Sequence, residues 1–225
     1  MNLIVRLFSA AALAGLVFGL TPMPASTATL SPAPHGGEIA FVRSIQKDLG
    51  TRFATVKEAQ RAGYFRYTNE DNTGAISYAD LHWHSSDPQH PSQLWYDVHG
   101  NLLGADFSEL QSASPTAPHL WAVDAARWLP FRAHIHYVLT GPGGTEMYGA
   151  TGIKKFTAAG GNPLAPRAQT LVKMHIAKSA AGVKRVFLFP AIWDLIVWIK
   201  PNPNGAFAEH NPAVVPSAKA ERDSM

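Results

Sequence analysis

Apolar residues recur every three or four positions between residues 38 and 62, the spacing that places side chains on one face of an α-helix. The first run comprises Ile39, Val42, Ile45 and Leu49, and the second comprises Phe53, Val56, Ala59 and Ala62. Gly50 and Gly63 come near the ends of these runs, where glycine commonly ends a helix. Thr55 and Glu58 have the spacing of a capping box in the second run. We therefore expect two packing helices.

After Gly63 the pattern shifts toward the alternation of apolar and polar residues that is typical of strands. The expected strands cover residues 75–84, 93–98, 102–107, 131–139, 146–153, 183–189 and 192–200, and a tight turn is expected at His99-Gly100-Asn101. Helical spacing returns at 121–128 and 166–178. Because strands and helices do not alternate regularly, we expect an α+β fold with a curved antiparallel sheet or barrel-like sheet and packing helices.

Residues 1–28 have the features of a secretory signal peptide: Arg6, then an apolar run from Leu7 to Leu20, then small residues for cleavage. The apolar run is shorter than the roughly 20 residues that a membrane span needs. We therefore expect a periplasmic or secreted protein without a stable membrane span. A Pro-rich tether (29–37), a single α+β domain (38–215) and a flexible tail (216–225) should follow.

Composition excludes several function classes. The chain of 225 residues contains no cysteine, which excludes disulfides, thiolate metal sites and a cysteine nucleophile. The formal net charge of +3 is distributed in short clusters such as Lys154-Lys155. A nucleic-acid partner would require basic residues concentrated on one face, so we expect no nucleic acid as a partner.

Two His-x-His segments are the most specific chemical signal in the chain. They are His82-Trp83-His84 and His134-Ile135-His136. Alternate side chains of a strand share a face, so each segment would direct both imidazoles to the same side. If the two strands pair, four nitrogen ligands could converge on one point, and the sequence therefore predicts a metal site.

Other residues could complete this site. His175 on the expected helix 166–178, or Glu146 on the expected strand 146–153, could be a further ligand. Nitrogen and oxygen ligands suit transition metals, and zinc or copper is the expected cofactor. The alternative is that the histidines are incidental in a chain that contains ten of them.

Two other features bear on a binding site. The chain has six tryptophans, which either belong to the core or form the wall of a ligand pocket: Trp83, Trp95, Trp121, Trp128, Trp193 and Trp198. Asp194 lies in an otherwise apolar strand, and a buried carboxylate needs a partner. It could orient a metal-ligating histidine, but pairing with Arg132 or Lys200 is the preferred interpretation.

Several short motifs together resemble a group of largely uncharacterised secreted bacterial proteins. The motifs are AQRAGY (59–64), LHW (81–83), PSQLWY (91–96), GNLLG (100–104), WDLIVW (193–198), NPNGAF (202–207) and NP (211–212). The resemblance implies export and a similar fold rather than an activity. This chain has Ile196 where the group carries a histidine, so a site residue is absent at that position.

The sequence thus leads to an exported protein with a histidine-lined pocket that binds a transition metal or a small-molecule ligand. The expected metal-site residues are His82, His84, His134, His136 and His175. The alternative is a non-catalytic periplasmic binding or structural module whose histidines are incidental. The pattern does not decide whether the protein is an enzyme.

Overall fold

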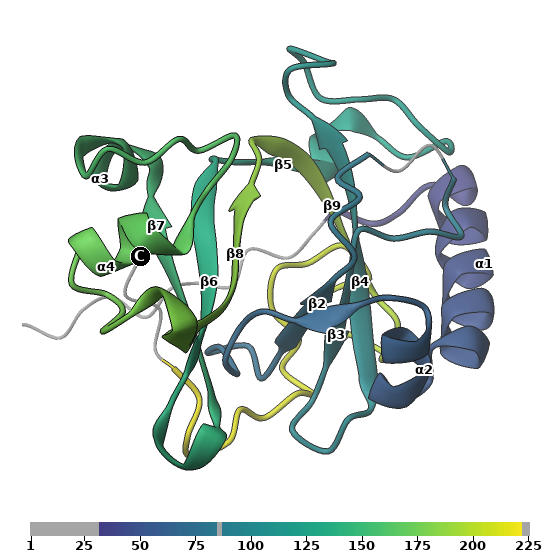
Figure 1. Ribbon diagram of the computed structural model, residues 1–225. Helices are drawn as coiled ribbons and strands as arrows, with labels where there is room; N and C mark the ends of the chain where they lie inside the picture. Colours follow the sequence, from purple (N-terminus) through teal and green to yellow (C-terminus); the bar gives the residue numbers. More distant parts are fainter. Residues whose placement is uncertain (1–31, 85–86, 222–225) are drawn as a thin grey trace, which may run out of the picture.

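The computed structural model describes residues 32–84 and 87–221, whose elements are arranged in four layers (Figure 1). Helices α1 (Gly36–Arg52) and α2 (Val56–Arg61) lie on one side of a six-stranded sheet. A three-stranded sheet lies on the other side, and helices α3 (Ile153–Ala158) and α4 (Ala168–Lys173) cover its outer face. The predicted α+β class is confirmed, although neither sheet closes into a barrel. The expected signal peptide lies outside the described residues.

The large sheet is antiparallel and has the strand order β1-β2-β3-β4-β9-β5. Its strands are β1 (Phe65–Arg66), β2 (Ile76–Ala79), β3 (Gln93–Tyr96), β4 (Leu102–Leu110), β9 (Ile192–Trp198) and β5 (Trp128–Phe131). The predicted turn around Gly100 joins β3 to β4, and Gly100 has a φ of 81°. Strand β5 is an edge strand, which tolerates Pro130 because proline lacks the N–H that an inner strand must donate.

The small sheet is also antiparallel, with the order β7-β6-β8. It consists of β6 (His134–Thr140), β7 (Glu146–Gly152) and β8 (Val183–Phe189). Ile135 and Leu139 of β6 face outward and form a buried cluster with Phe156 and Leu171 from α3 and α4. His134 and His136, which alternate with these residues, face the large sheet instead.

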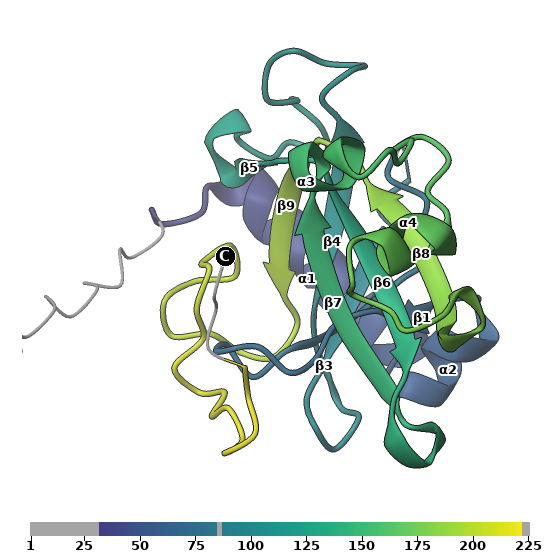
Figure 2. The same ribbon diagram turned by 60° about the vertical axis from the view of Figure 1, so that its left-hand side comes forward.

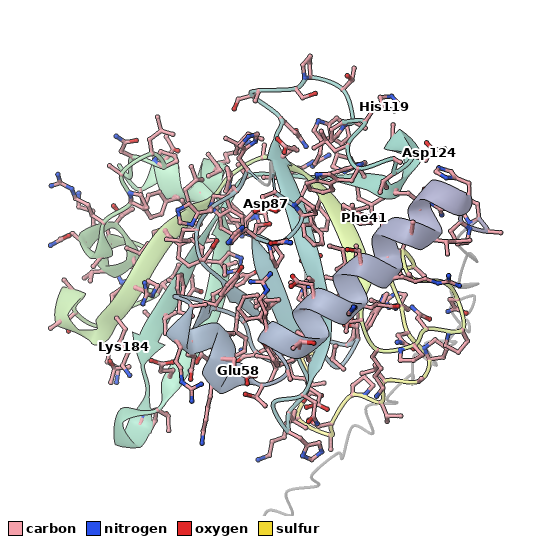
Figure 3. The ribbon with its side chains drawn as sticks, turned by 90° about the vertical axis from the view of Figure 1, so that its right-hand side faces the viewer. Phe41, Glu58, Asp87, His119, Asp124 and Lys184 are labelled. Carbon is pink, nitrogen blue, oxygen red and sulfur yellow. The ribbon has the colours of Figure 1, made fainter. Side chains whose placement is uncertain are left out.

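The two faces of the large sheet differ in chemistry. On the helical side, β3, β4 and β9 contribute apolar residues to a core that includes Phe41, Ile45 and Leu49 of α1. Figure 3 looks onto this side, with α1 crossing in front of the sheet and Asp124 near the N-terminal end of the helix. The opposite face, toward the small sheet, carries buried polar side chains: Gln93, Asp106, Ser108 and Asp194.

The helix boundaries follow local hydrogen bonds. Helix α1 begins two residues earlier than expected because the His35 and Glu38 side chains each accept a hydrogen bond from the other residue's backbone N–H. It continues through Gly50 to Arg52, whose guanidinium pairs with Asp48 one turn earlier. The predicted capping box of α2 is confirmed, since Glu58 accepts from the Thr55 N–H at 2.8 Å.

Several predicted elements were wrong in extent. The strand predicted at 75–84 ends at Ala79, because Leu81 has a φ of 69° and turns the chain. The strand predicted at 131–139 is divided between β5 in the large sheet and β6 in the small sheet.

The helical predictions also changed in extent. The helix predicted at 121–128 is reduced to one 3₁₀ turn, Ala125–Arg127, because Trp121 and Ala122 have positive φ values. The helix predicted at 166–178 is the shorter α4, and the left-handed backbone of His175 follows it. Helix α3 was not predicted.

The chain after β9, residues 199–221, contains no helix or strand and forms loops beside the end of β9 (yellow in Figure 2). The Trp198 indole N–H donates to the Ala208 carbonyl at 2.6 Å, which holds the first part of this segment. Near its end, the Ser217 N–H donates to the buried Glu70 carboxylate at 2.6 Å. The described part of the predicted flexible tail is therefore hydrogen-bonded to the body of the protein.

Candidate functional site

A pocket of about 420 Å³ lies between the two sheets. The large sheet contributes residues from five strands, and the small sheet contributes residues from two. The C-terminal segment after β9 also contributes to the lining. Its polar lining includes Tyr67, Gln93, Asp106, His134, His136 and Asp194, and its apolar lining includes Trp95, Leu129, Phe131, Phe189, Ile196 and Trp198. The volume and the mixed lining are typical of a small-molecule site.

The first His-x-His segment does not contribute to this pocket. His82 is strongly exposed and its ring lies 3.2 Å from the Asp80 carboxylate, while the Asp80 side chain also accepts from the His82 N–H. These residues follow β2 rather than extend it, so the expectation that they share a strand face was wrong. His84 is also exposed, and its Nδ1 lies 2.5 Å from a carboxylate oxygen of Glu109.

The second His-x-His segment lies on a strand with both rings on one face, as predicted. The Nε2 atoms of His134 and His136 are 2.8 Å apart. The His134 ring stacks on Phe189 and the His136 ring stacks on Phe187, both from β8. The predicted pairing of the two His-x-His strands was wrong, because β6 pairs with β7 and β8 while β2 belongs to the other sheet.

The remaining proposed ligands lie elsewhere. His175 is exposed and lies two residues after the end of α4, so it is not part of the pocket lining. Glu146 on β7 accepts hydrogen bonds from Lys184 and Tyr148. Among residues 32–84 and 87–221, no three His, Asp or Glu side chains are grouped as a metal site.

The hydrogen bonds of the histidine pair define its neutral tautomers. The Arg132 carbonyl can only accept, so His134 donates from Nδ1 to this oxygen at 2.8 Å. Neutral His134 then accepts at Nε2, and His136 donates to it. Burial lowers the pKa of both rings, and burial together with the neighbouring His134 lowers the pKa of His136 to about 3. The pair is therefore neutral at pH 7.

A buried carboxyl pair forms the opposite wall. Asp106 on β4 and Asp194 on β9 are 4% and 3% exposed. Asp106 accepts from the Trp95 indole N–H at 2.8 Å, and Asp194 accepts from the Ser108 hydroxyl at 3.0 Å. The two carboxyls are also close enough for each to influence the pKa of the other.

Burial raises the pKa of both carboxyls, that of Asp194 to about 7, and the charge of Asp194 raises the pKa of Asp106 further. The pair therefore keeps a proton to a higher pH than an isolated aspartate does. The preferred pairing of Asp194 with Arg132 or Lys200 was wrong, because its partners among the described residues are Ser108 and Asp106. The reason is register: Asp194 lies directly opposite Ser108 on the neighbouring strand.

Tyr67 connects the two walls. Its ring packs edge-on against His136 at a centroid distance of 4.7 Å, and its hydroxyl donates to the Gln93 side chain. Burial and the charges of Asp106 and Asp194 raise the pKa of Tyr67, so its hydroxyl remains protonated. The polar groups of both sheets therefore surround one space.

Some of the six tryptophans line the pocket, and others pack in the core. Trp95 and Trp198 line the pocket and contact each other edge-to-face at 5.4 Å. Trp121 and Trp128 belong to the core beneath α1. Trp83 packs on Phe189 just outside the pocket lining, and the indole N–H of Trp193 donates to a loop carbonyl at Ser114.

Sequence reasoning missed Asp106, Tyr67 and Gln93. Asp106 gave the same signal as Asp194, a single acid within an otherwise apolar strand, and could have been found by it. Tyr67 and Gln93 gave no such signal, because tyrosine and glutamine are common at strand positions of either face. Ile196, the position that departs from the resembled group, lines the pocket directly opposite Asp106.

This arrangement is competent for proton transfer as well as for binding. A carboxyl whose pKa is raised toward neutrality, as that of Asp194 is, can both donate and accept a proton near neutral pH. Asp106, Asp194 and His136 are buried, and burial strengthens their electrostatic interactions with a bound molecule.

No protein-family model, curated protein or solved structure gives a significant match to this chain. The resemblance to the secreted bacterial group therefore stays a prediction. Within residues 32–84 and 87–221, no helix has both the length and the hydropathy required to cross a bilayer. The candidate function depends on the site geometry alone.

Proposed function

We propose that this protein is exported and binds a small organic molecule in the pocket between its two sheets. The observation that carries the proposal is the polar inner face of the large sheet. Asp106, Ser108 and Asp194 are each less than 5% exposed there, and Asp106 and Asp194 line a pocket of about 420 Å³.

Two sheets that face one another normally fill the space between them with interdigitating apolar side chains. A buried polar group costs about 1–3 kcal/mol unless its hydrogen bonds are satisfied. Here Asp106 Oδ1 and His136 Nδ1 are both buried, and neither has a well-formed hydrogen-bond partner among the described residues. The Gly149 backbone acts to raise the pKa of His136, but burial outweighs this effect. These groups favour a ligand site over a purely structural module, because a structural role would not require them.

The proposal is tested with a neutral, environment-sensitive dye, N-phenyl-1-naphthylamine. We expect Leu129→Trp to weaken dye binding at least tenfold, because Leu129 lies on the inner face of β5 opposite Asp194 and its replacement fills the pocket. The matched control is Leu164→Trp, since Leu164 is 85% exposed and lies outside the pocket. Equal binding by both variants and by the wild type would place the dye elsewhere and overturn the proposal.

A transition metal is the second candidate ligand, favoured by the convergence of the His134 and His136 Nε2 atoms at 2.8 Å. A metal would replace the hydrogen bond between the two rings: with Nδ1 of His134 donating to the Arg132 carbonyl, its Nε2 lone pair would bind the metal, and His136 would move its proton from Nε2 to Nδ1. Zinc or copper would then take two protein nitrogens and further ligands from solvent or substrate.

Elemental analysis after incubation with zinc or copper and desalting tests this second candidate. We expect about one metal per chain in the wild type and in His82→Ala, and loss of metal in His134→Ala. His82 is the control because it lies in a different part of the fold. Retention of metal by His134→Ala would exclude the histidine pair as the site.

A further inference from the structure

The charges around the pocket are all of one sign. Four carboxylic acids line it, Asp71, Asp106, Asp194 and Glu209, and none of the described lining residues is lysine or arginine. The other titratable groups of the lining are Tyr67, His134, His136 and His210. An anionic ligand would meet repulsion here and would find no basic side chain to neutralise it.

The negative charge of the buried carboxyl pair is not neutralised by any basic side chain of the described residues. Asp106 and Asp194 form no ion pair within the described part of the chain, and their hydrogen-bond donors are the neutral Trp95 and Ser108 side chains. A buried carboxylate without a cation is unfavourable, and a bound cation would offset that cost. The carboxyl pair is therefore a preformed acceptor for a positively charged hydrogen-bond donor.

The aromatic groups next to this pair suit the same kind of ligand. The indole N–H of Trp95 is held on Asp106, which keeps the ring beside the carboxyl pair, and Trp198 packs against Trp95. Phe131 and Phe189 line the same pocket. Aromatic faces attract organic cations and also bury apolar groups.

An inorganic divalent cation fits this wall less well. Such ions take three or more protein ligands or retain several waters, and no cluster of three His, Asp or Glu is present among the described residues. Of the four carboxylic acids in the lining, only Asp106 and Asp194 are buried.

We propose that the ligand of this pocket is a primary amine in its ammonium form attached to a small apolar or aromatic body. The ammonium group hydrogen-bonds to Asp106 and Asp194, and the apolar body packs against Trp95, Trp198 and Phe189. This inference rests on the proposed function, because it names the class of molecule that occupies the same pocket.

Three probes of similar size and different charge test the inference: benzylamine, benzyl alcohol and benzoate. Each is titrated into the mature protein at pH 8 with EDTA present, and binding is followed by calorimetry and tryptophan fluorescence. We expect benzylamine to bind at least tenfold more tightly than either other probe. We expect Asp194→Asn and Asp106→Asn each to weaken benzylamine binding by about tenfold while binding of benzyl alcohol stays within twofold.

Asp97→Asn is the matched control, because Asp97 lies in the exposed β3–β4 turn and should leave all three affinities unchanged. Thermal unfolding verifies that each variant is folded, and either aspartate variant alone suffices for the test. Equal or tighter binding of benzyl alcohol or benzoate would overturn the inference and leave the proposed function standing. Failure of all three probes to bind would also overturn it, and the neutral-dye experiment decides the proposed function independently.

Discussion

At the scale of single residues, the paired carboxyls of Asp106 and Asp194 dominate the chemistry of this protein. Their pKa values are raised by burial and by each other, whereas isolated Asp side chains in folded proteins more often have lowered values. The raised pKa means that the folded state holds a proton that the unfolded chain releases at lower pH. The pair therefore destabilises the folded protein as the pH rises.

The sign of this pH dependence follows from the number of protons that the folded and the unfolded states bind. Asp194 has a folded pKa of about 7 against an ordinary value of 3.8, so between about pH 4 and pH 7 the folded state binds more protons than the unfolded state. The contribution of the pair to the free energy of unfolding falls through this range. The lowered pKa values of His134 and His136 act in the opposite direction over an overlapping range, so the pair must be isolated by substitution.

We predict that Asp194→Asn removes the part of this pH dependence that comes from Asp194. The asparagine can still accept from Ser108 through its oxygen and can donate to Asp106 through its amide. The free energy of unfolding of the variant, minus that of the wild type, should be more positive at pH 8 than at pH 5. The expected difference is on the order of 2–3 kcal/mol, at about 1.4 kcal/mol per pKa unit. Urea denaturation at the two pH values measures this difference.

Asp97→Asn provides the contrast in the same experiment. Although partial burial opposes it, hydrogen bonds from Asn101 and His99 lower the pKa of Asp97, so Asp97 is ionised in both states between pH 5 and pH 8. Its replacement should change the free energy of unfolding equally at both pH values. If Asp194→Asn also gave a constant change, the raised pKa would be refuted.

At the scale of elements, a buried ion pair joins α1 to the 3₁₀ turn before β5. Arg127 donates from Nε and Nη2 to the two oxygens of Glu38 at 3.0 and 2.9 Å, and the Asp124 N–H donates to the same carboxylate at 3.1 Å. Both ion-pair partners are less than 10% exposed. Glu38 thus both caps α1 and attaches it to the segment that enters the edge of the large sheet.

We predict that Glu38→Gln lowers the free energy of unfolding by about 3–5 kcal/mol, because it removes one charge of a buried pair. Glu58→Gln is a matched substitution at the equivalent position of the α2 capping box, where the Thr55–Glu58 hydrogen bond is exposed, and should cost about 1 kcal/mol or less. Chemical denaturation compares the two variants. Similar losses would show that Glu38 acts only as a cap.

At the scale of the whole molecule, the C-terminal segment completes the pocket that the sheets begin. Glu209 and His210 from this segment belong to the lining, and Asn211 is buried where its side chain donates to the Pro201 carbonyl at 3.1 Å. The far end is attached through Glu70, which accepts from both the backbone N–H and the hydroxyl of Ser217. Glu221 adds two hydrogen bonds at this end: its N–H donates to the Glu70 carbonyl at 2.7 Å, and its carboxylate accepts from the Asn69 side chain at 2.6 Å.

We predict that Ser217→Ala loosens this end without unfolding the body. Amide hydrogen exchange in residues 212–221 should accelerate by about tenfold, the equivalent of one lost charge-assisted hydrogen bond. Exchange in α1 should not change. Ser114→Ala, which removes a hydroxyl bonded within its own loop, is the control. Acceleration that extends to both sheets would mean that Ser217 supports the global fold instead.

Sequence patterns identified the parts of this protein that depend on local physics. The capping box at Thr55, the turn around Gly100 and most of the strands in both sheets follow from side-chain periodicity and from backbone preferences within a few residues. The α+β class follows from the order of those elements. Same-face placement of His134 and His136 was predictable for the same reason, since it requires only that one segment be a strand.

Tertiary structure alone decided which of these parts meet. Leu81 turns the chain before His82, and the crossing between β5 and β6 assigns the two His-x-His segments to different parts of the fold, so the predicted four-histidine cluster does not form. The register of β4 against β9 instead brings Asp106 beside Asp194, from segments far apart in the chain. Periodicity specifies the face on which a side chain lies, but strand order and register determine what that face meets, and both depend on the packing of the complete chain.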